Sequence, residues 1–234
     1  MEETKVYFTS FKTSEHENLI QKLHRLMKQA GFESIDFNEK YAAIKIHFGE
    51  YGNLAFLRPN YAKVVADYVK ELGGKAFLTD CNTLYVGSRK NALDHLDTAY
   101  VNGFSPLQTG CHVLIGDGLK GTDETIVPID GEYVKEAKIG HAIMDADVFI
   151  SLTHFKEHET AGFECMLSCL PSVTSVGMAS LLPHKEMQVD GSLNVTVGVS
   201  FLLALLFRTC GVLLCIHYIF LRTDCIILKN IACS

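Results

Sequence analysis

Short apolar runs alternate with amphipathic runs over the first 152 residues, and this alternation limits the possible folds more than any other feature of the sequence. The apolar runs have the length and the β-branched and aromatic content of strands. They lie at residues 5–10, 41–48, 75–79, 112–116 and 148–152. Repeated strand–helix–strand order predicts an α/β fold with a mostly parallel sheet and helices on both faces, in Rossmann-like layers.

Local start and stop signals place the helices between these strands. The three longer helices are expected from Ser14 to Gly31, from Pro59 to Gly73 and from Ser88 to Gly103. A capping-box pattern, a proline at the first helical position and a hydroxyl cap mark their starts, and a glycine follows each end. A hairpin is expected over residues 125–138 and a short helix over 141–146.

The composition changes sharply near the C-terminus. Residues 191–234 carry only four charged side chains, but they hold four of the eight cysteines of the chain. We therefore expect an α/β domain over residues 1–163 and a divergent, apolar, Cys-rich tail over residues 164–234, which is aberrant or truncated.

Residues 197–221 are apolar at 19 of 25 positions, which is long enough to span a bilayer. Arg208 lies near the centre of this run and would cost about 2.5–3.5 kcal/mol on insertion scales. A membrane tether is therefore the less favoured expectation. A buried hairpin or a terminus without an evolved role is the alternative.

The charge balance and the cysteine content limit the partners and the compartment. The net charge of −6 gives no basic field, so we expect no nucleic-acid partner. No secretory signal is recognisable at the N-terminus, and eight cysteines in 234 residues do not form a dense disulfide framework. The expected location is the cytoplasm.

Polar side chains follow four of the five predicted strands. In open parallel sheets, ligands bind outside the carboxyl ends of the strands, which right-handed crossovers bring to one edge. The candidates in chain order are His47, Glu50, Asn53, Asp80, Asn82, Asp117, His154, Lys156 and His158. Imidazoles, carboxylates and a lysine at one edge can bind a divalent metal or perform acid–base chemistry. Taken singly, Asp80, Asn82 and Asp117 are equally well explained as Asx turns or helix caps.

Two spacings qualify these candidates. His154 and His158 are four residues apart, which brings both rings to one side of either a strand or a helix. The glycines Gly116, Gly118 and Gly121 match the dinucleotide pattern GxGxxG, but extended chain follows them instead of a helix. We therefore expect these glycines to form a turn.

Five longer runs resemble a known family, the uncharacterised iron–sulfur-center proteins (domain of unknown function three-six-two). These runs are Ala43–Glu50, Phe77–Tyr85, Gly87–Ala92, Ile115–Gly121 and Asp145–His158. The resemblance covers residues 5–163. It implies an α/β domain paired with a ferredoxin-like module, and hence electron transfer in a protein whose reaction is not established. The positions that match the family pattern are His47, Glu50, Asn53, Arg58, Asp80, Asn82, Arg89, Asn91, Asp117, His154, Lys156 and His158.

The tail departs from this family pattern. The ferredoxin-like module is not recognisable, because four, nine and seven residues separate the tail cysteines Cys210, Cys215, Cys225 and Cys233. Iron–sulfur clusters are held by cysteines at much tighter spacing. The tail spacing therefore argues against cluster ligation by these four cysteines.

Three functions follow as hypotheses, and they leave open whether the chain is an enzyme. The first is an iron–sulfur redox or electron-transfer protein that exchanges electrons with a redox partner. The second is a metal-dependent enzyme on a small anionic or carbonyl substrate. The third is a non-catalytic binding domain, with a membrane tether over residues 197–221 as an option. For the second, the assigned residues are His47, His154 and His158 for metal, Glu50, Asp80 and Lys156 for catalysis, and Asn53, Arg58, Asn82, Arg89 and Asp117 for cofactor binding.

Overall fold

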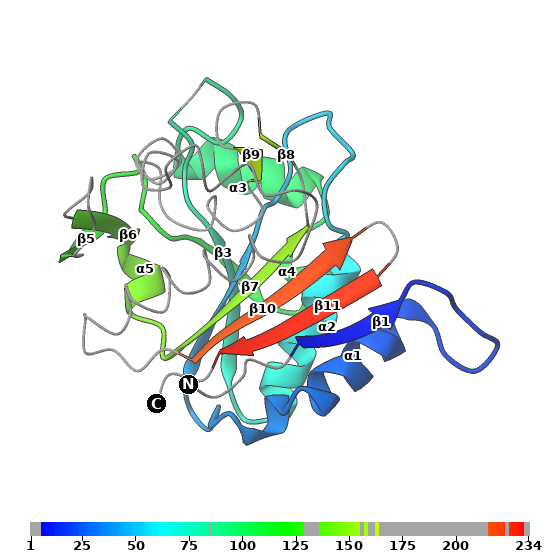
Figure 1. Cartoon of the computed structure of the whole chain (residues 1–234). Coiled ribbons are helices and arrows are strands. Elements are labelled where there is room, and N and C mark those ends of the chain that lie inside the picture. Colours follow the sequence, from blue (N-terminus) through cyan, green and yellow to red (C-terminus); the bar gives the residue numbers. More distant parts are fainter. Residues whose placement is uncertain are drawn as a thin grey trace.

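A twisted sheet of seven strands forms the centre of the described part of the chain (Figure 1). The computed structural model describes residues 6–84, 86–128, 136–154, 157–158, 162–163, 215–222 and 225–231. The sheet has the order β1-β11-β10-β7-β2-β3-β4. Its strands are β1 (Val6–Ser10), β2 (Tyr41–Ile46), β3 (Lys75–Asp80), β4 (His112–Ile115), β7 (Val148–His154), β10 (Cys215–Arg222) and β11 (Cys225–Ile231).

The sheet is mostly parallel, as predicted. Strands β10, β7, β2, β3 and β4 run in one direction, while β11 is antiparallel to both of its neighbours, β10 and β1. The carboxyl ends of the parallel strands therefore share one edge. The fold is α/β, with a sheet flanked by helices.

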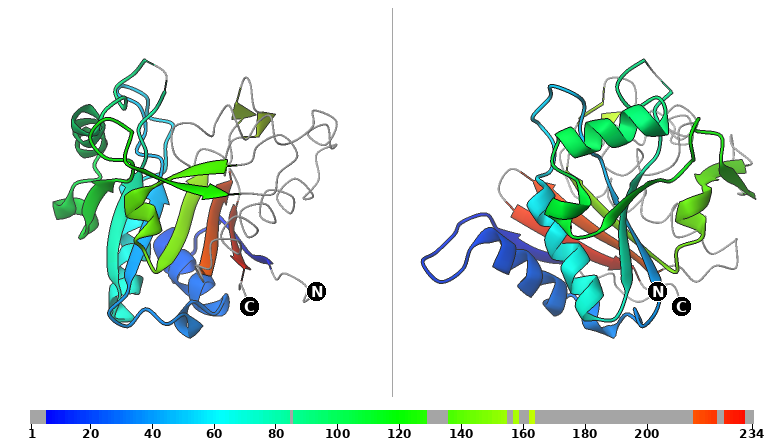
Figure 2. Two further views of the ribbon diagram at one scale, coloured as in Figure 1. Left: turned by 90° about the vertical axis from the view of Figure 1, so that its left-hand side faces the viewer. Right: turned by 180° about the vertical axis from the view of Figure 1, so that it is seen from behind.

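Helices α1 (Leu19–Gln29) and α2 (Pro59–Glu71) lie side by side on one face of the sheet (Figure 2, right). Their apolar side chains form the main core with alternate residues of the central strands, such as Ile44 and Leu78. Strand β2 is buried on both of its faces, as expected for a central parallel strand. The second face buries a charged residue, Lys45, between Ile44 and Ile46.

The first helix begins four residues later than predicted from Ser14. Asn18 caps α1, because its side-chain oxygen accepts from the backbone N–H of Gln21 at 3.0 Å and the Gln21 side chain accepts from the Asn18 N–H at 2.9 Å. The Ser14 hydroxyl accepts from the Glu17 N–H in a preceding turn. A true capping box next to the apolar stripe therefore fixes the start of the helix.

The predicted cap of the third helix is also wrong. Helix α3 (Ala92–Val101) begins after Asn91, whose side chain accepts from the N–H groups of Leu93 and Asp94. The Ser88 hydroxyl instead donates to Glu50. Helix α3 lies beyond the carboxyl ends of the central strands, at the top of Figure 1, so residues on its buried side face that edge. The predicted start of α2 at Pro59 is confirmed.

The remaining elements are short. The predicted hairpin is confirmed as the antiparallel pair β5 (Glu124–Pro128) and β6 (Glu136–Gly140), followed by α5 (His141–Met144). Gly116–Gly121 forms turns, as expected, with positive φ at Gly118 and Gly121. The other short elements are η1 (Phe32–Ser34), α4 (Pro106–Thr109), β8 (Glu157–His158) and β9 (Gly162–Phe163).

Two segments of the C-terminal region belong to the sheet of the body. Strand β10 pairs with β7, and β11 pairs with β1. Residues 164–214, 223–224 and 232–234 lie outside the described residues, so the boundary expected at residue 163 stays a prediction. So does the tether, since of residues 197–221 the structure describes only 215–221. Within the described part of the chain, no helix has the length and apolar character needed to cross a membrane.

Candidate functional site

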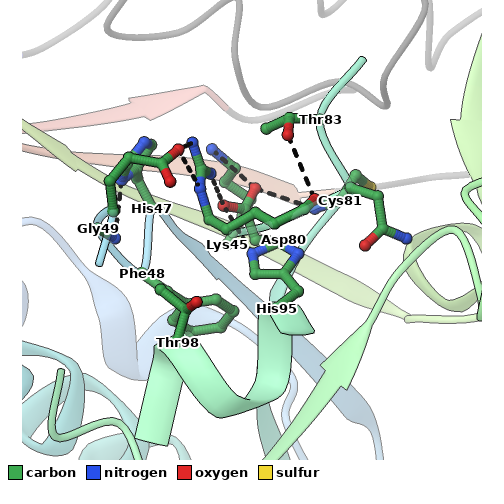
Figure 3. A network of polar contacts seen from close by, with 12 residues as sticks. Lys45, His47, Phe48, Gly49, Asp80, Cys81, Thr83, His95 and Thr98 are labelled. Atoms are coloured by element: carbon green, nitrogen blue, oxygen red, sulfur yellow. Dashed lines mark hydrogen bonds and ion pairs between the residues drawn. The ribbon is translucent and has the colours of Figure 1, made fainter. Parts of the chain in front are cut away.

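The carboxylate of Asp80 is the centre of a buried polar network at the carboxyl edge of the sheet (Figure 3). Asp80 is the last residue of β3. The Lys45 Nζ of the neighbouring strand lies 3.5 Å from Asp80 Oδ1, and the Arg89 Nη1 lies 3.3 Å from Oδ2. The exposed fractions of these three side chains are 3–4%. The site therefore keeps two cations and a carboxylate almost entirely out of water.

Arg89 connects Asp80 to a second carboxylate, that of Glu50. The Arg89 Nε and Nη2 lie 2.7 Å and 2.5 Å from Glu50 Oε1, and the Ser88 hydroxyl donates to Glu50 Oε2 at 3.0 Å. The Glu50 side chain is 29% exposed, in contrast to its guanidinium partner. Glu50 is thus the solvent-facing end of a chain of charges that runs inward through Arg89 to Asp80 and Lys45.

Asp80 is held as a carboxylate inside the protein. Its burial alone would raise the pKa of this carboxyl, but the charge of Lys45 and the other basic side chains around it outweigh the burial and hold the pKa below its ordinary value. The Cys81 backbone N–H also donates to Oδ1 at 3.0 Å. The negative charge is therefore available at neutral pH to orient both cations.

His95 faces the same carboxylate from α3. Its Nε2 lies 3.8 Å from Asp80 Oδ2, and its ring packs edge-on against Phe48 at a centroid distance of 5.7 Å. Burial lowers the pKa of this imidazole to about 4, so the ring is neutral at pH 7. Neither ring nitrogen has a hydrogen-bond partner among the described residues.

Asn82 and Asp117 form a separate buried pair one strand further along the edge. The backbone N–H and the side-chain amide of Asn82 both donate to Asp117, at 2.9–3.1 Å. Burial raises the pKa of Asp117 to about 6. Asn82 Oδ1 is buried without a partner among the described residues. This pair ties the loop after β3 to the turn after β4.

His47, a predicted metal ligand, lies at this edge just after β2. Its Nδ1 accepts a hydrogen bond from the Gly49 N–H at 2.9 Å. A neutral imidazole whose Nδ1 accepts carries its proton on Nε2, so this ring presents a donor there. Metal binding through Nε2 would require the ring to give up the Gly49 bond.

The predicted site residues have different outcomes. Glu50, Asp80 and Arg89 are brought together, Asn82 and Asp117 pair with each other, and His47 lies near Asp80. Asn53 and Arg58 are exposed; Asn53 makes an Asx turn to the Ala55 N–H, and Arg58 precedes α2. The backbones of His154 and His158 belong to β7 and β8, while their side chains and all of Lys156 lie outside the described residues. Among the side chains that are described, no three metal-ligating residues gather.

Sequence reasoning missed Lys45, Ser88 and His95 as members of the network. Lys45 carries a recognisable signal, since it is a lone charge inside an apolar strand. His95 carries a weaker one, because it is four residues before the buried Ala99 on the same side of α3. The role of Ser88 has no local signal, because its partner Glu50 lies 38 residues away.

The fold and this network define the class of protein: an α/β protein whose buried charges gather at the edge where open parallel sheets bind ligands. The chain belongs to the family described as Domain of unknown function (DUF362), whose model matches residues 42–197. All members of the network lie inside the matched range.

Two known proteins are similar to this chain. Thylakoid-associated protein sll1697 from Synechocystis sp. (strain ATCC 27184 / PCC 6803 / Kazusa) is 28% identical over 124 residues, which are 51% of this chain and 35% of that protein. The structure of the lactate racemase apoprotein from Thermoanaerobacterium thermosaccharolyticum matches 90% of this chain and 46% of that chain, with 10% identity and a TM-score of 0.49. The chain thus spans well under two thirds of either protein.

Proposed function

We propose that this protein is an enzyme that binds a small anionic or carbonyl-containing substrate at the carboxyl edge of the sheet, with help from a divalent metal. The observation that carries the proposal is the Lys45–Asp80–Arg89 cluster, a set of charges buried at the ligand-binding edge of an open parallel sheet. Burying each such charge costs several kcal/mol before pairing, and strongly perturbed groups of this kind concentrate at functional sites.

The network divides into residues that can reach a substrate and residues that hold them. Glu50 and His47 are partly exposed, so they are the members that an arriving ligand contacts first. Lys45, Asp80 and Arg89 are buried behind them and, while Glu50 is in place, fix their position and charge. Asn82 and Asp117 shape the adjoining wall through their mutual hydrogen bonds.

The metal is assigned to His47, His154 and His158, with Lys156 as the residue that stabilises negative charge or moves a proton. The support concerns His47 and His154, which lie at the ends of neighbouring parallel strands, since β7 pairs with β2 with Leu152 opposite Ile46. His158 and Lys156 are assigned from their place in the sequence just after His154. His47 fits this role only in a second conformation, in which Nδ1 releases the Gly49 N–H. A bound divalent ion would supply Lewis-acid stabilisation of negative charge.

Electron transfer is the alternative proposal, and it rests on the resemblance of the five sequence runs to the iron–sulfur-center proteins. The backbone geometry restricts how a cluster would be held. Cys225 lies opposite Arg222 in the β10–β11 strand pair, and Cys215 is the first residue of β10, seven residues before Arg222. At about 3.3 Å per residue these cysteines lie roughly 20 Å apart, too far to bind one cluster together. A redox role would therefore need other ligands or a partner.

Cytoplasmic location stays part of the proposal, and cell fractionation tests it.

The experiment is a metal and acid-labile sulfide analysis of the full chain purified without oxygen, followed by thermal melts with small carboxylates, phosphate and carbonyl compounds. The enzyme proposal expects a divalent metal and a compound that raises the melting temperature only when that metal is present. The double variant His154→Ala, His158→Ala should lose the metal. The control is His112→Ala, at the amino end of β4. Iron with matching sulfide would favour electron transfer, and a metal-independent response to every compound would overturn the enzyme proposal.

A further inference from the structure

We propose that Arg89 and Ser88 form a carboxylate-binding subsite that Glu50 occupies in the free protein and that a ligand carboxylate takes over. This inference rests on the proposed function and narrows its substrate class to molecules that bear a carboxylate. It also gives the site a regulatory contact, because Glu50 must leave before the ligand binds.

The donors around Glu50 have the arrangement that recognises a carboxylate. Arg89 Nε donates to one oxygen of Glu50 at 2.7 Å, and Arg89 Nη2 lies 2.5 Å from the same oxygen as an ion-pair contact. The Ser88 hydroxyl donates to the other oxygen at 3.0 Å. Charge-assisted bonds from a planar guanidinium are the strong and directional way to hold a carboxylate. The Glu50 side chain therefore stands in for the carboxylate of a ligand.

The donors Arg89 and Ser88 are held by the surrounding protein, whereas Glu50, which occupies the subsite, is partly exposed. Arg89 is buried, its Nη1 is bound to Asp80, and its backbone carbonyl accepts from the Thr83 N–H at 2.8 Å. Ser88 precedes α3, where the Thr98 hydroxyl donates to its carbonyl at 2.9 Å. Glu50 is the most exposed of the charged residues in the network. The Ser88 hydroxyl oxygen also accepts from the Tyr51 N–H at 3.3 Å. Exchange of the occupant by a rotation of the Glu50 side chain alone therefore leaves both donors in place.

The segment that carries Glu50 has a structure suited to movement. Gly49 and Gly52 flank it with φ values of +84° and +82°, and the next residue, Tyr51, is exposed. A Cβ at Gly49 would lie 2.7 Å from the Phe56 ring and 2.8 Å from Asn102, so the start of the segment is tightly fitted. Gly52 has no atom within 4 Å of its Cβ position. A rotation of Glu50 away from Arg89 is thus confined to an exposed turn between two glycines.

The charge count also favours an anion in place of Glu50. In the free protein, Asp80 and Glu50 balance Lys45 and Arg89. Once Glu50 leaves, Asp80 alone faces two buried cations, and an unbalanced buried charge is costly. A ligand carboxylate restores both the charge and the hydrogen bonds from Arg89 and Ser88, whereas a neutral carbonyl restores only hydrogen bonds.

The test uses acetate as the probe and Glu50→Ala as the variant. Because Glu50 no longer competes, acetate should bind the variant about tenfold more tightly than the wild type, as expected when a blocked state is removed. Binding is measured by isotope-labelled acetate in NMR titrations at constant ionic strength. Acetate, and not chloride, should also restore part of the melting temperature that the variant loses.

Two matched variants make the result specific. The Arg25–Glu17 pair uses the same two guanidinium nitrogens, with Nε donating to Glu17 Oε1 at 2.6 Å and Nη2 to Oε2 at 3.2 Å, but the Arg25 side chain is 43% exposed. Glu17→Ala should therefore show no gain in acetate binding. The double variant Glu50→Ala, Arg89→Met should lose the acetate response of the single variant. If Glu50→Ala does not fold, Glu50→Gln is used, for which a smaller gain is expected.

Equal acetate affinity in the wild type and in the Glu50 variant would overturn the inference, as would an equal gain for inorganic phosphate. The acetate measurement needs neither metal nor turnover. Acetate binding that depends on Arg89 in a protein without any metal response would therefore overturn only the proposed enzyme function. A metal response without acetate binding would overturn only the subsite.

Discussion

Lys45 on β2 and Asp80 at the end of β3 form an ion pair in which neither side chain is more than 4% exposed, with Nζ 3.5 Å from Oδ1. The pair joins two neighbouring parallel strands at the edge where a ligand would bind. Arg89 holds the second oxygen of the same carboxylate. Asp80 is thus an anion that both buried cations share.

Replacing Asp80 with Asn should strongly destabilise the protein, because it leaves Lys45 and Arg89 with too little negative charge. Removing one partner from a buried ion pair costs about 3–5 kcal/mol. The free energy of unfolding is measured by urea titration. The control is Asp67→Asn, which breaks the exposed Lys63–Asp67 pair and should cost at most about 1 kcal/mol. Equal effects of the two variants would contradict the role given to Asp80.

His95→Leu should leave the free energy of unfolding at pH 7 nearly unchanged. The variant should lack the loss of stability that the wild type shows in acid. The folded pKa of about 4 lies below the ordinary histidine pKa of 6.5, so the unfolded chain binds the proton first as the pH falls. The wild type therefore loses stability from pH 6.5 down to pH 4, by up to about 3 kcal/mol. Urea titrations at pH 7 and pH 5 measure the difference, with exposed His112→Leu as control. An unchanged acid slope in His95→Leu would refute a buried, neutral ring.

Asp117→Asn should remove a pH dependence of the folding stability whose sign is opposite to that caused by His95. The folded pKa of about 6 lies above the ordinary aspartate pKa of 3.8, so the folded state takes up the proton first as the pH falls. Asp117 therefore favours the folded state below pH 4, and this contribution is lost as the pH rises to 6, by up to about 3 kcal/mol. Comparing the stability of the variant and the wild type at pH 4.5 and pH 7 isolates this effect. The same difference at both pH values would contradict the prediction.

Gly140→Ala should destabilise the junction between β6 and α5. A Cβ at this position would lie 2.6 Å from the carbonyl oxygen of Gly116 and 2.7 Å from its carbonyl carbon, so the two backbones would have to separate. The φ of Gly140 is −54°, so the effect is steric and not a matter of backbone preference. Overpacking of this kind costs about 1–3 kcal/mol. Thermal melts should rank Gly140→Val below Gly140→Ala, and equal melting temperatures would show that the junction has room.

The sequence by itself determined the elements and the edge where the site would lie. The five strands, the proline start of α2 and the turn at Gly116–Gly121 follow from apolar periodicity and local turn chemistry, which depend on residues close together in the chain. Parallel strand order then placed Glu50, Asp80, Asn82 and Asp117 at one edge. The exact start of α1 was missed, because Ser14 and Asn18 both offer a capping pattern and packing selects between them.

Only the tertiary structure decided which side chains became partners. Asp80 with Lys45, Asn82 with Asp117, and Ser88 with Glu50 are pairs that lie 35, 35 and 38 residues apart. The pairing of β1 with β11 joins residues near opposite ends of the chain. Periodicity shows that a residue faces the core or the edge, but not which distant residue it meets there. That choice follows from strand order, register and the need to neutralise buried charge, which act only once the chain is folded.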